Sequence, residues 1–167
     1  MAKSNKSIQI FSFCAIALGA LGLIFWLFLA GCSYSASAMG VKASSSAMGM
    51  AMIFGGDIKA SAAGISTSAK AFEFSFLLFI GFIAAIAGLV ITILPLCGVK
   101  AKLFPVIALA CFVVAALFCF LTKTACNPVD GGRDALKEFN LGIGAILGGI
   151  CFIGAACTSA LPVVLKK

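Results

Sequence analysis

Four long stretches of the sequence carry no charged residue and are strongly apolar. They cover approximately residues 8–30, 74–98, 103–122 and 140–162. A helix needs about 20 apolar residues to cross the roughly 30 Å of hydrocarbon in a bilayer, and each stretch has that length. Backbone polar groups cannot stay unpaired in lipid, and the stretches do not alternate as barrel strands would. They therefore predict four transmembrane helices.

The longest polar segment, residues 31–73, lies between the first two apolar stretches and is rich in Ser, Ala and Gly. Residues 33–38 alternate between polar and apolar side chains, which is typical of a strand, and residues 57–69 alternate again in part. We predict a small strand–helix–strand cap that lies on the helices. A flexible Ser/Ala-rich linker is the alternative interpretation.

Residues that favour helix ends define the bounds of the helix in this predicted cap. Three serines at residues 44–46 are suited to cap a helix that reaches Phe54, and Gly55 with Gly56 would end it. The apolar side chains of this segment need cover from the bundle or from a partner, and they form the candidate contact surface: Met48, Met50, Met52, Ile53 and Phe54.

The second polar segment, residues 123–139, is shorter and contains Asn-Pro and Gly-Gly pairs, which favour turns. We expect a solvated turn here. Together these patterns predict one membrane domain over residues 1–167, an all-α four-helix bundle with a small extracytoplasmic cap of short strands and a short helix.

Composition supports a membrane protein. Of the 167 residues, 63% are hydrophobic and 10% are charged, and the mean hydropathy is +1.22. A soluble domain of this size cannot cover so much apolar surface. The bilayer is therefore the expected surrounding and the first expected partner.

The charges orient the bundle if basic residues collect on the cytoplasmic side. With the N-terminus inside, the inner segments hold six basic residues and no acid: Lys3, Lys6, Lys100, Lys102, Lys166 and Lys167. The outer segments hold the other six basic residues and all five acids: Asp57, Glu73, Asp130, Asp134 and Glu138. We expect a multi-pass protein of the cell membrane with both termini cytoplasmic. Its net charge of +7 then needs no nucleic-acid partner.

Two of the eight cysteines, Cys32 and Cys126, fall in the outer segments. A disulfide between them is one hypothesis, since the exterior is oxidising. Two separate thiols are the alternative.

Cys32 also ends the sequence Leu29-Ala30-Gly31-Cys32, which resembles the lipobox of bacterial lipoproteins. The resemblance implies that Cys32 is lipidated and that the preceding residues are removed. The apolar run of about 23 residues is longer than the 7–15 of a signal peptide, so we expect a retained span.

Small residues recur at four-residue spacing in the apolar stretches. Gly144 and Gly148 form a GxxxG pair in the last one. Such pairs let helix backbones approach closely, and we expect this pair to serve packing within the bundle or between copies.

Residues suited to catalysis are scarce. The chain has no His, and the middle of each apolar stretch contains no ionisable residue, so neither a catalytic triad nor a proton relay can be assembled there. No phosphate-binding, dinucleotide or zinc motif is present. We expect neither an enzyme nor a cofactor or metal site.

Four spans with a longer first and a shorter second outer loop resemble the claudin and tetraspan-type plan. The chain also looks like the small uncharacterised four-span membrane proteins of bacteria. Both resemblances concern architecture. The Trp and Cys signature of claudin first loops is absent, and the one Trp, Trp26, lies within the first stretch. The resemblance therefore assigns no functional residue.

These observations leave three hypotheses for function. The first is a structural or interaction protein that binds a partner, or another copy, through its first outer loop. The second is a small oligomeric channel or permeability protein, suggested by the glycine-rich last stretch. The third is a membrane protein lipidated at Cys32.

Overall fold

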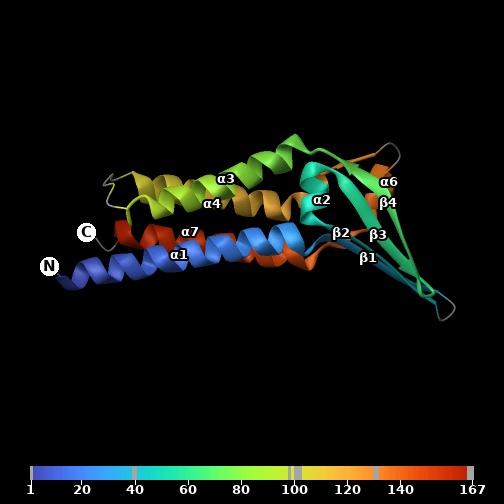
Figure 1. The fold of residues 1–167 in the computed structure, drawn as a ribbon, viewed down its shortest axis with the longest axis horizontal. Helices are drawn as coiled ribbons and strands as arrows, with labels where there is room; N and C mark the ends of the chain where they lie inside the picture. Colours follow the sequence, from blue (N-terminus) through green and yellow to red (C-terminus); the bar gives the residue numbers. More distant parts are fainter. Residues whose placement is uncertain (1, 39–40, 98, 100–102, 130–131, 165–167) are drawn as a thin grey trace.

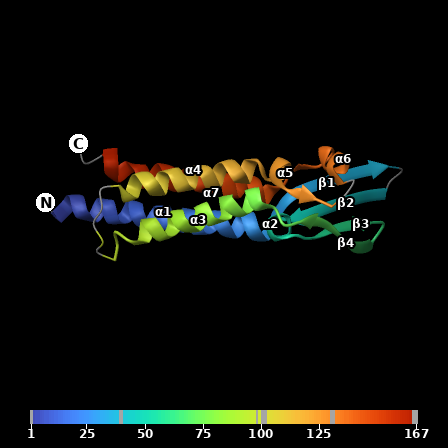
Figure 2. The same cartoon turned by 90° about the horizontal axis from the view of Figure 1, so that it is seen from above.

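The computed structural model describes residues 2–38, 41–97, 99, 103–129 and 132–164. Four long helices lie side by side at one end of an elongated molecule, and a curved sheet extends from the other end (Figures 1 and 2). The first helix begins and the last helix ends at the end of the bundle that faces away from the sheet.

The bundle contains α1 (Ala2–Phe28), α3 (Phe76–Ile93), α4 (Phe104–Phe120) and α7 (Ile143–Val164). Helices α1, α3 and α7 each hold a window long and apolar enough to cross a membrane, whereas α4 is a shorter apolar helix of 17 residues. Three candidate spans therefore indicate a membrane location. Helix α4 packs against both α3 and α7, and α1 packs against α7 and α3.

Aromatic side chains fill the centre of the bundle. Trp26, Phe112 and Phe152 are fully buried. The ring of Phe152 lies 6.3 Å from that of Trp26, edge to face, and 6.3 Å from that of Phe112 in a stack. Many other large apolar side chains of these helices point outward, as expected of a surface that faces lipid.

The helix ends differ from the predicted bounds for local reasons. Helix α3 begins after Ser75, whose hydroxyl accepts a hydrogen bond from the Leu78 amide, and ends at Ile93 instead of residue 98. Pro95 lies directly after the helix cap Leu94 and has no backbone N–H, so it cannot continue the helical hydrogen bonds. Helix α7 begins at Ile143 instead of residue 140, since residues 140–141 pair as a strand.

The sheet corrects the all-α prediction. Its six antiparallel strands form a half-barrel in the order β5-β4-β3-β2-β1-β6. The strands are β1 (Ala30–Ala38), β2 (Val41–Met48), β3 (Gly56–Ala62), β4 (Ile65–Glu73), β5 (Asn127–Pro128) and β6 (Asn140–Leu141). Four of them have seven to nine residues, so the sheet is a major part of the molecule and not a minor cap.

The predicted strand–helix–strand order is also wrong. Two hairpins, β1–β2 and β3–β4, flank the short helix α2 (Gly49–Phe54). The serines at 44–46 lie in β2, where they pair with β1 and β3, and they do not cap α2, which begins after Met48. The helix does end at Phe54, since Gly55 adopts a φ of 84°.

The second outer segment is not only a solvated turn. It contains nearly all of α5 (Thr122–Ala125), α6 (Gly132–Lys137) and the edge strand β5, and the other edge strand, β6, directly follows it. Strand β5 pairs with the end of β4, and β6 pairs with the start of β1. The two outer segments therefore form one sheet.

Candidate interaction surface

The side chains of the four long strands differ in size and polarity between the two faces of the sheet. Pairing places Tyr34, Ser45, Ala60 and Thr67 in one row across the sheet. The row beside it is all serine and belongs to the opposite face: Ser35, Ser44, Ser61 and Ser66. Side chains of successive residues point to opposite faces, so the rows alternate along the sheet.

We call the two sides the alanine face and the serine face. The alanine face comprises Tyr34, Ala36, Ala43, Ser45, Ala47, Ile58, Ala60, Ala62, Ile65, Thr67 and Ala69. The serine face comprises Ser33, Ser35, Ser37, Lys42, Ser44, Ser46, Asp57, Lys59, Ser61, Ser66, Ser68 and Lys70. One face is apolar and nearly uncharged, while the other is hydroxylated and carries the charges.

The alanine face is buried next to the bundle and exposed farther from it. Next to the bundle, Ala47 is buried, and the Tyr34 ring lies 5.4 Å from the ring of Phe139. Farther out, Ala62, Thr67 and Ala69 are exposed, and Ile65 is 70% exposed. The far half of this apolar face therefore meets solvent.

Both edges of the sheet are partly open within the described residues. Strand β4 pairs with β5 at Phe72 and Glu73, and the Ala71 carbonyl accepts a hydrogen bond from the Val129 amide, which leaves the outer edge of residues 65–70 without a strand partner there. Strand β1 pairs with β6 only at Cys32 and Ser33. Open strand edges present backbone donors and acceptors to another chain.

The five residues of the predicted contact surface separate in the structure. Met52 and Ile53 are residues of α2 whose side chains are fully buried in the core, so they are not available to a partner. Met48, Met50 and Phe54 are exposed, and the Phe54 ring packs edge to face against Phe79 and Phe82 of α3. Helix α2 thus sits against the bundle where the sheet begins (Figure 1).

Two polar side chains that sequence reasoning missed join α1 and the start of α3 to α5. Trp26 Nε1 donates a 3.0 Å hydrogen bond to the Thr122 hydroxyl, which in turn donates to the carbonyl of Phe118. Ser75 Oγ donates to the carbonyl of Ala125 at 2.6 Å. The signal for the first contact is Trp26 itself, since a buried indole N–H needs an acceptor, but its partner is 96 residues away.

Cys32 and Cys126 are both buried and belong to the same core cluster. Both are thiols in the structure, and Cys126 Sγ donates to the carbonyl of Lys123 at 3.1 Å. The pKa of Cys32 is raised to about 12, chiefly by burial and also by nearby Cys126, while the Lys123 ammonium lowers it. The full burial of Cys32 and the packing of α1 against α7 favour a retained first span over lipidation.

Gly144 and Gly148 face α1 inside the bundle. A Cβ added at Gly144 would lie 2.6 Å from the Phe25 carbonyl oxygen, and one at Gly148 would lie 3.1 Å from that of Gly22. These glycines let α7 and α1 approach closely. The GxxxG pair therefore serves the packing of α7 against α1 within one copy.

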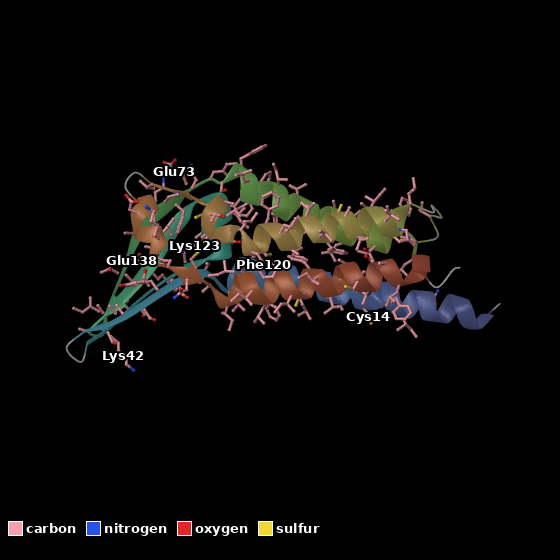
Figure 3. All side chains as sticks on the ribbon, turned by 180° about the vertical axis from the view of Figure 1, so that it is seen from behind. Cys14, Lys42, Glu73, Phe120, Lys123 and Glu138 are labelled. Carbon is pink, nitrogen blue, oxygen red and sulfur yellow. The ribbon has the colours of Figure 1, made fainter. Side chains whose placement is uncertain are left out.

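Charged side chains gather at the sheet end. Figure 3 shows Lys42, Glu73, Lys123 and Glu138 there, whereas Cys14 lies along the helices. A hollow of about 420 Å³ opens at the base of β3 and β4, between aromatic and charged side chains: Phe54, Asp57, Lys70, Phe72, Glu73 and Phe74. Within the described ranges, no group of three or more His, Cys, Asp or Glu residues is arranged to hold a metal ion.

Comparison with known proteins identifies no family. No family model matches the sequence, and a search of the curated proteins found no significant match. The resemblance to the claudin and tetraspan-type plan therefore stays a prediction about architecture.

Proposed function

We propose that this chain is a non-enzymatic, four-span membrane protein that contacts another protein through its outer sheet. The first outer segment supplies all four long strands of that sheet. The proposed partner is a protein of the same membrane or a second copy of the chain.

One observation carries the proposal: the far part of the sheet has an apolar face without cover. Every residue of β4 from Ile65 to Lys70 is exposed, and the alanine face there presents Ile65, Thr67 and Ala69. A sheet of several strands gains stability in water when its apolar face is packed. A partner that covers the alanine face would bury apolar area and satisfy the open edge of β4 at the same time.

The shorter α4 is proposed as the fourth span. Its 17 residues correspond to about 25 Å of helix, and α5 continues nearly the same path after a turn at Leu121. Its position between α3 and α7 supports this assignment, because neighbours that cross the bilayer enclose it.

The proposed orientation places the sheet outside and both termini in the cytoplasm. The described acids Asp57, Glu73, Asp134 and Glu138 all belong to the sheet end. The basic residues Lys100, Lys102, Lys166 and Lys167, on which the inside prediction depends, lie outside the described residues. A Ser37→Cys variant in intact cells tests the orientation: an impermeant maleimide should label Ser37→Cys more strongly than the unmodified chain, and equal labelling would contradict it.

A pair of neighbouring substitutions tests the contact surface. Ala69→Lys places a charge on the exposed alanine face, and Ser68→Lys places the same charge on the exposed serine face. Ala69→Lys should reduce recovery of cross-linked partner or of a differently tagged copy from native membranes, whereas Ser68→Lys should retain it. Equal recovery from both variants and the unmodified chain would contradict the proposal.

A further inference from the structure

Cys32 and Cys126 come from different outer segments but meet at the base of the sheet. Cys32 lies near the start of β1 and is paired with Ala47 of β2 and Leu141 of β6. Cys126 directly follows α5, and α5 packs against β1. Both side chains are buried in one apolar cluster.

The packing of α5 against β1 brings Cys126 toward the strand that holds Cys32. A negative charge on Cys126 raises the pKa of Cys32, and the ammonium of Lys123 lowers it. The Lys123 Nζ is held by a 3.0 Å hydrogen bond to the Lys137 carbonyl. Two thiols and one fixed cation thus share a small region between the bundle and the sheet.

We propose that Cys32 and Cys126 form a disulfide that ties the first strand of the sheet to the end of α5. This inference rests on the proposed orientation, because the bond persists where the sheet end faces an oxidising compartment. It would join the two outer segments covalently at the point where the sheet leaves the bundle.

The chemistry is thiol–disulfide exchange with a disulfide donor, either a thiol oxidoreductase or oxidised glutathione. Cys126 is slightly exposed and Cys32 is fully buried, so the Cys126 thiolate attacks first, forms a mixed disulfide and releases one donor thiolate. The Cys32 thiolate then attacks the Cys126 sulfur and releases the second donor thiolate. The two cysteine protons pass to the two donor thiolates, so two protein thiols are oxidised and one donor disulfide is reduced.

The remaining cysteines lie elsewhere. Cys97 follows α3 at the far end of the bundle. The others lie within the long helices: Cys14, Cys111, Cys119, Cys151 and Cys157. A water-soluble disulfide donor does not reach thiols within apolar spans, so these residues serve as internal controls.

Peptide mapping of the full chain tests the bond without any substitution. Native membranes are harvested into an alkylating agent and then digested with trypsin and chymotrypsin. Residues 30–34 contain Cys32 alone, and residues 124–133 contain Cys126 alone. We expect these two peptides joined in nearly all of the protein, with Cys119 and Cys151 alkylated after denaturation. Recovery of both peptides as alkylated monomers would overturn the proposal.

A second experiment distinguishes an error in the proposed cysteine pairing from an error in the proposed membrane orientation. The purified chain is reduced in detergent and then exposed to oxidised glutathione. If the native protein is reduced but this sample forms the Cys32–Cys126 bond, the proposed orientation fails and the disulfide proposal fails with it. If neither sample forms the bond, the pairing itself is wrong, and the contact surface tested through Ala69 is unaffected.

Variants supply the last control. Cys32→Ser and Cys126→Ser should each abolish the linked peptide pair, while Cys97→Ser should leave it unchanged. A linked pair that persists in Cys32→Ser would assign the bond to another cysteine and contradict the proposal.

Discussion

The helical bundle and the outer sheet are joined end to end, but side-chain packing contributes differently to the stability of each. The bundle buries large rings, among them Trp26, Phe112 and Phe152. The far part of the sheet is made of Ala and Ser, and β4 is exposed at every position from Ile65 to Lys70. Side-chain packing therefore holds the bundle, while backbone pairing holds the outer sheet. A region without a core of its own is the one that gains most from a partner.

The largest effect is expected where the bundle packs most tightly. Phe112→Ala removes a fully buried ring and should lower the free energy of unfolding by about 3–5 kcal/mol. Thermal unfolding in detergent measures this loss. Phe13→Ala is the matched control, because Phe13 is 61% exposed on α1. If both variants lose the same stability, the bundle is not held by the proposed core.

A smaller effect is expected at the hydrogen bond that joins α1 to α5. Thr122→Val leaves the indole N–H of Trp26 without its acceptor, which should cost about 1–3 kcal/mol. The control Thr124→Val changes an exposed residue two positions away. Trp26→Phe combined with Thr122→Val should recover part of the loss, and unchanged stability in Thr122→Val would show that the bond contributes nothing.

The turn of the β3–β4 hairpin offers a way to strengthen the weaker region. Ala63 and Gly64 have φ values of 51° and 82°, a pair that type I′ hairpin turns favour with Asn-Gly. Ala63→Asn should stabilise the hairpin by about 0.5–1 kcal/mol, since Asn tolerates positive φ better than Ala. Slower amide exchange in β3 and β4, with no change in α3, is the expected measurement. Faster exchange in the hairpin would contradict the proposed turn.

The smallest effect concerns the reduced form of the protein. The pKa of Cys32 is raised from 9.0 to about 12, so the folded state holds this proton more tightly than the unfolded state. The associated stability is present below pH 9.0 and is lost as the pH rises toward about 12. Alkylation of Cys32 should keep accelerating above pH 10 in folded protein but level off near pH 9 after denaturation. A plateau near pH 9 in both states would contradict the burial of Cys32.

Sequence patterns predicted the bundle better than the sheet. An apolar run of about 20 residues has few alternatives to a membrane helix, so all four long helices were located to within a few residues. Strands β5 and β6 have two residues each, which is too short to carry an alternating pattern. The serines at 44–46 fit both a helix cap and a strand, and only pairing with β1 and β3 decides between them.

The contact surface was predicted on the segment that forms α2, and the structure buries two of its five residues. Apolar character placed Met52 and Ile53 on the contact surface, yet the approach of α2 to the bundle buries both. The alternation of Ala and Ser could be read from the sequence. The sequence could not show which residues form one row across the sheet, because a row depends on the register of four strands. One such row contains Ala36, Ala43, Ala62 and Ile65.

Photo-crosslinking from single positions tests the contact surface most directly. A benzophenone amino acid is placed at position 69 on the alanine face or at position 68 on the serine face, and native membranes are irradiated. The account predicts a discrete protein adduct from position 69 and little from position 68. Equal adducts from both positions, or none from position 69 in membranes that hold the protein at its native level, would contradict the role proposed for the sheet.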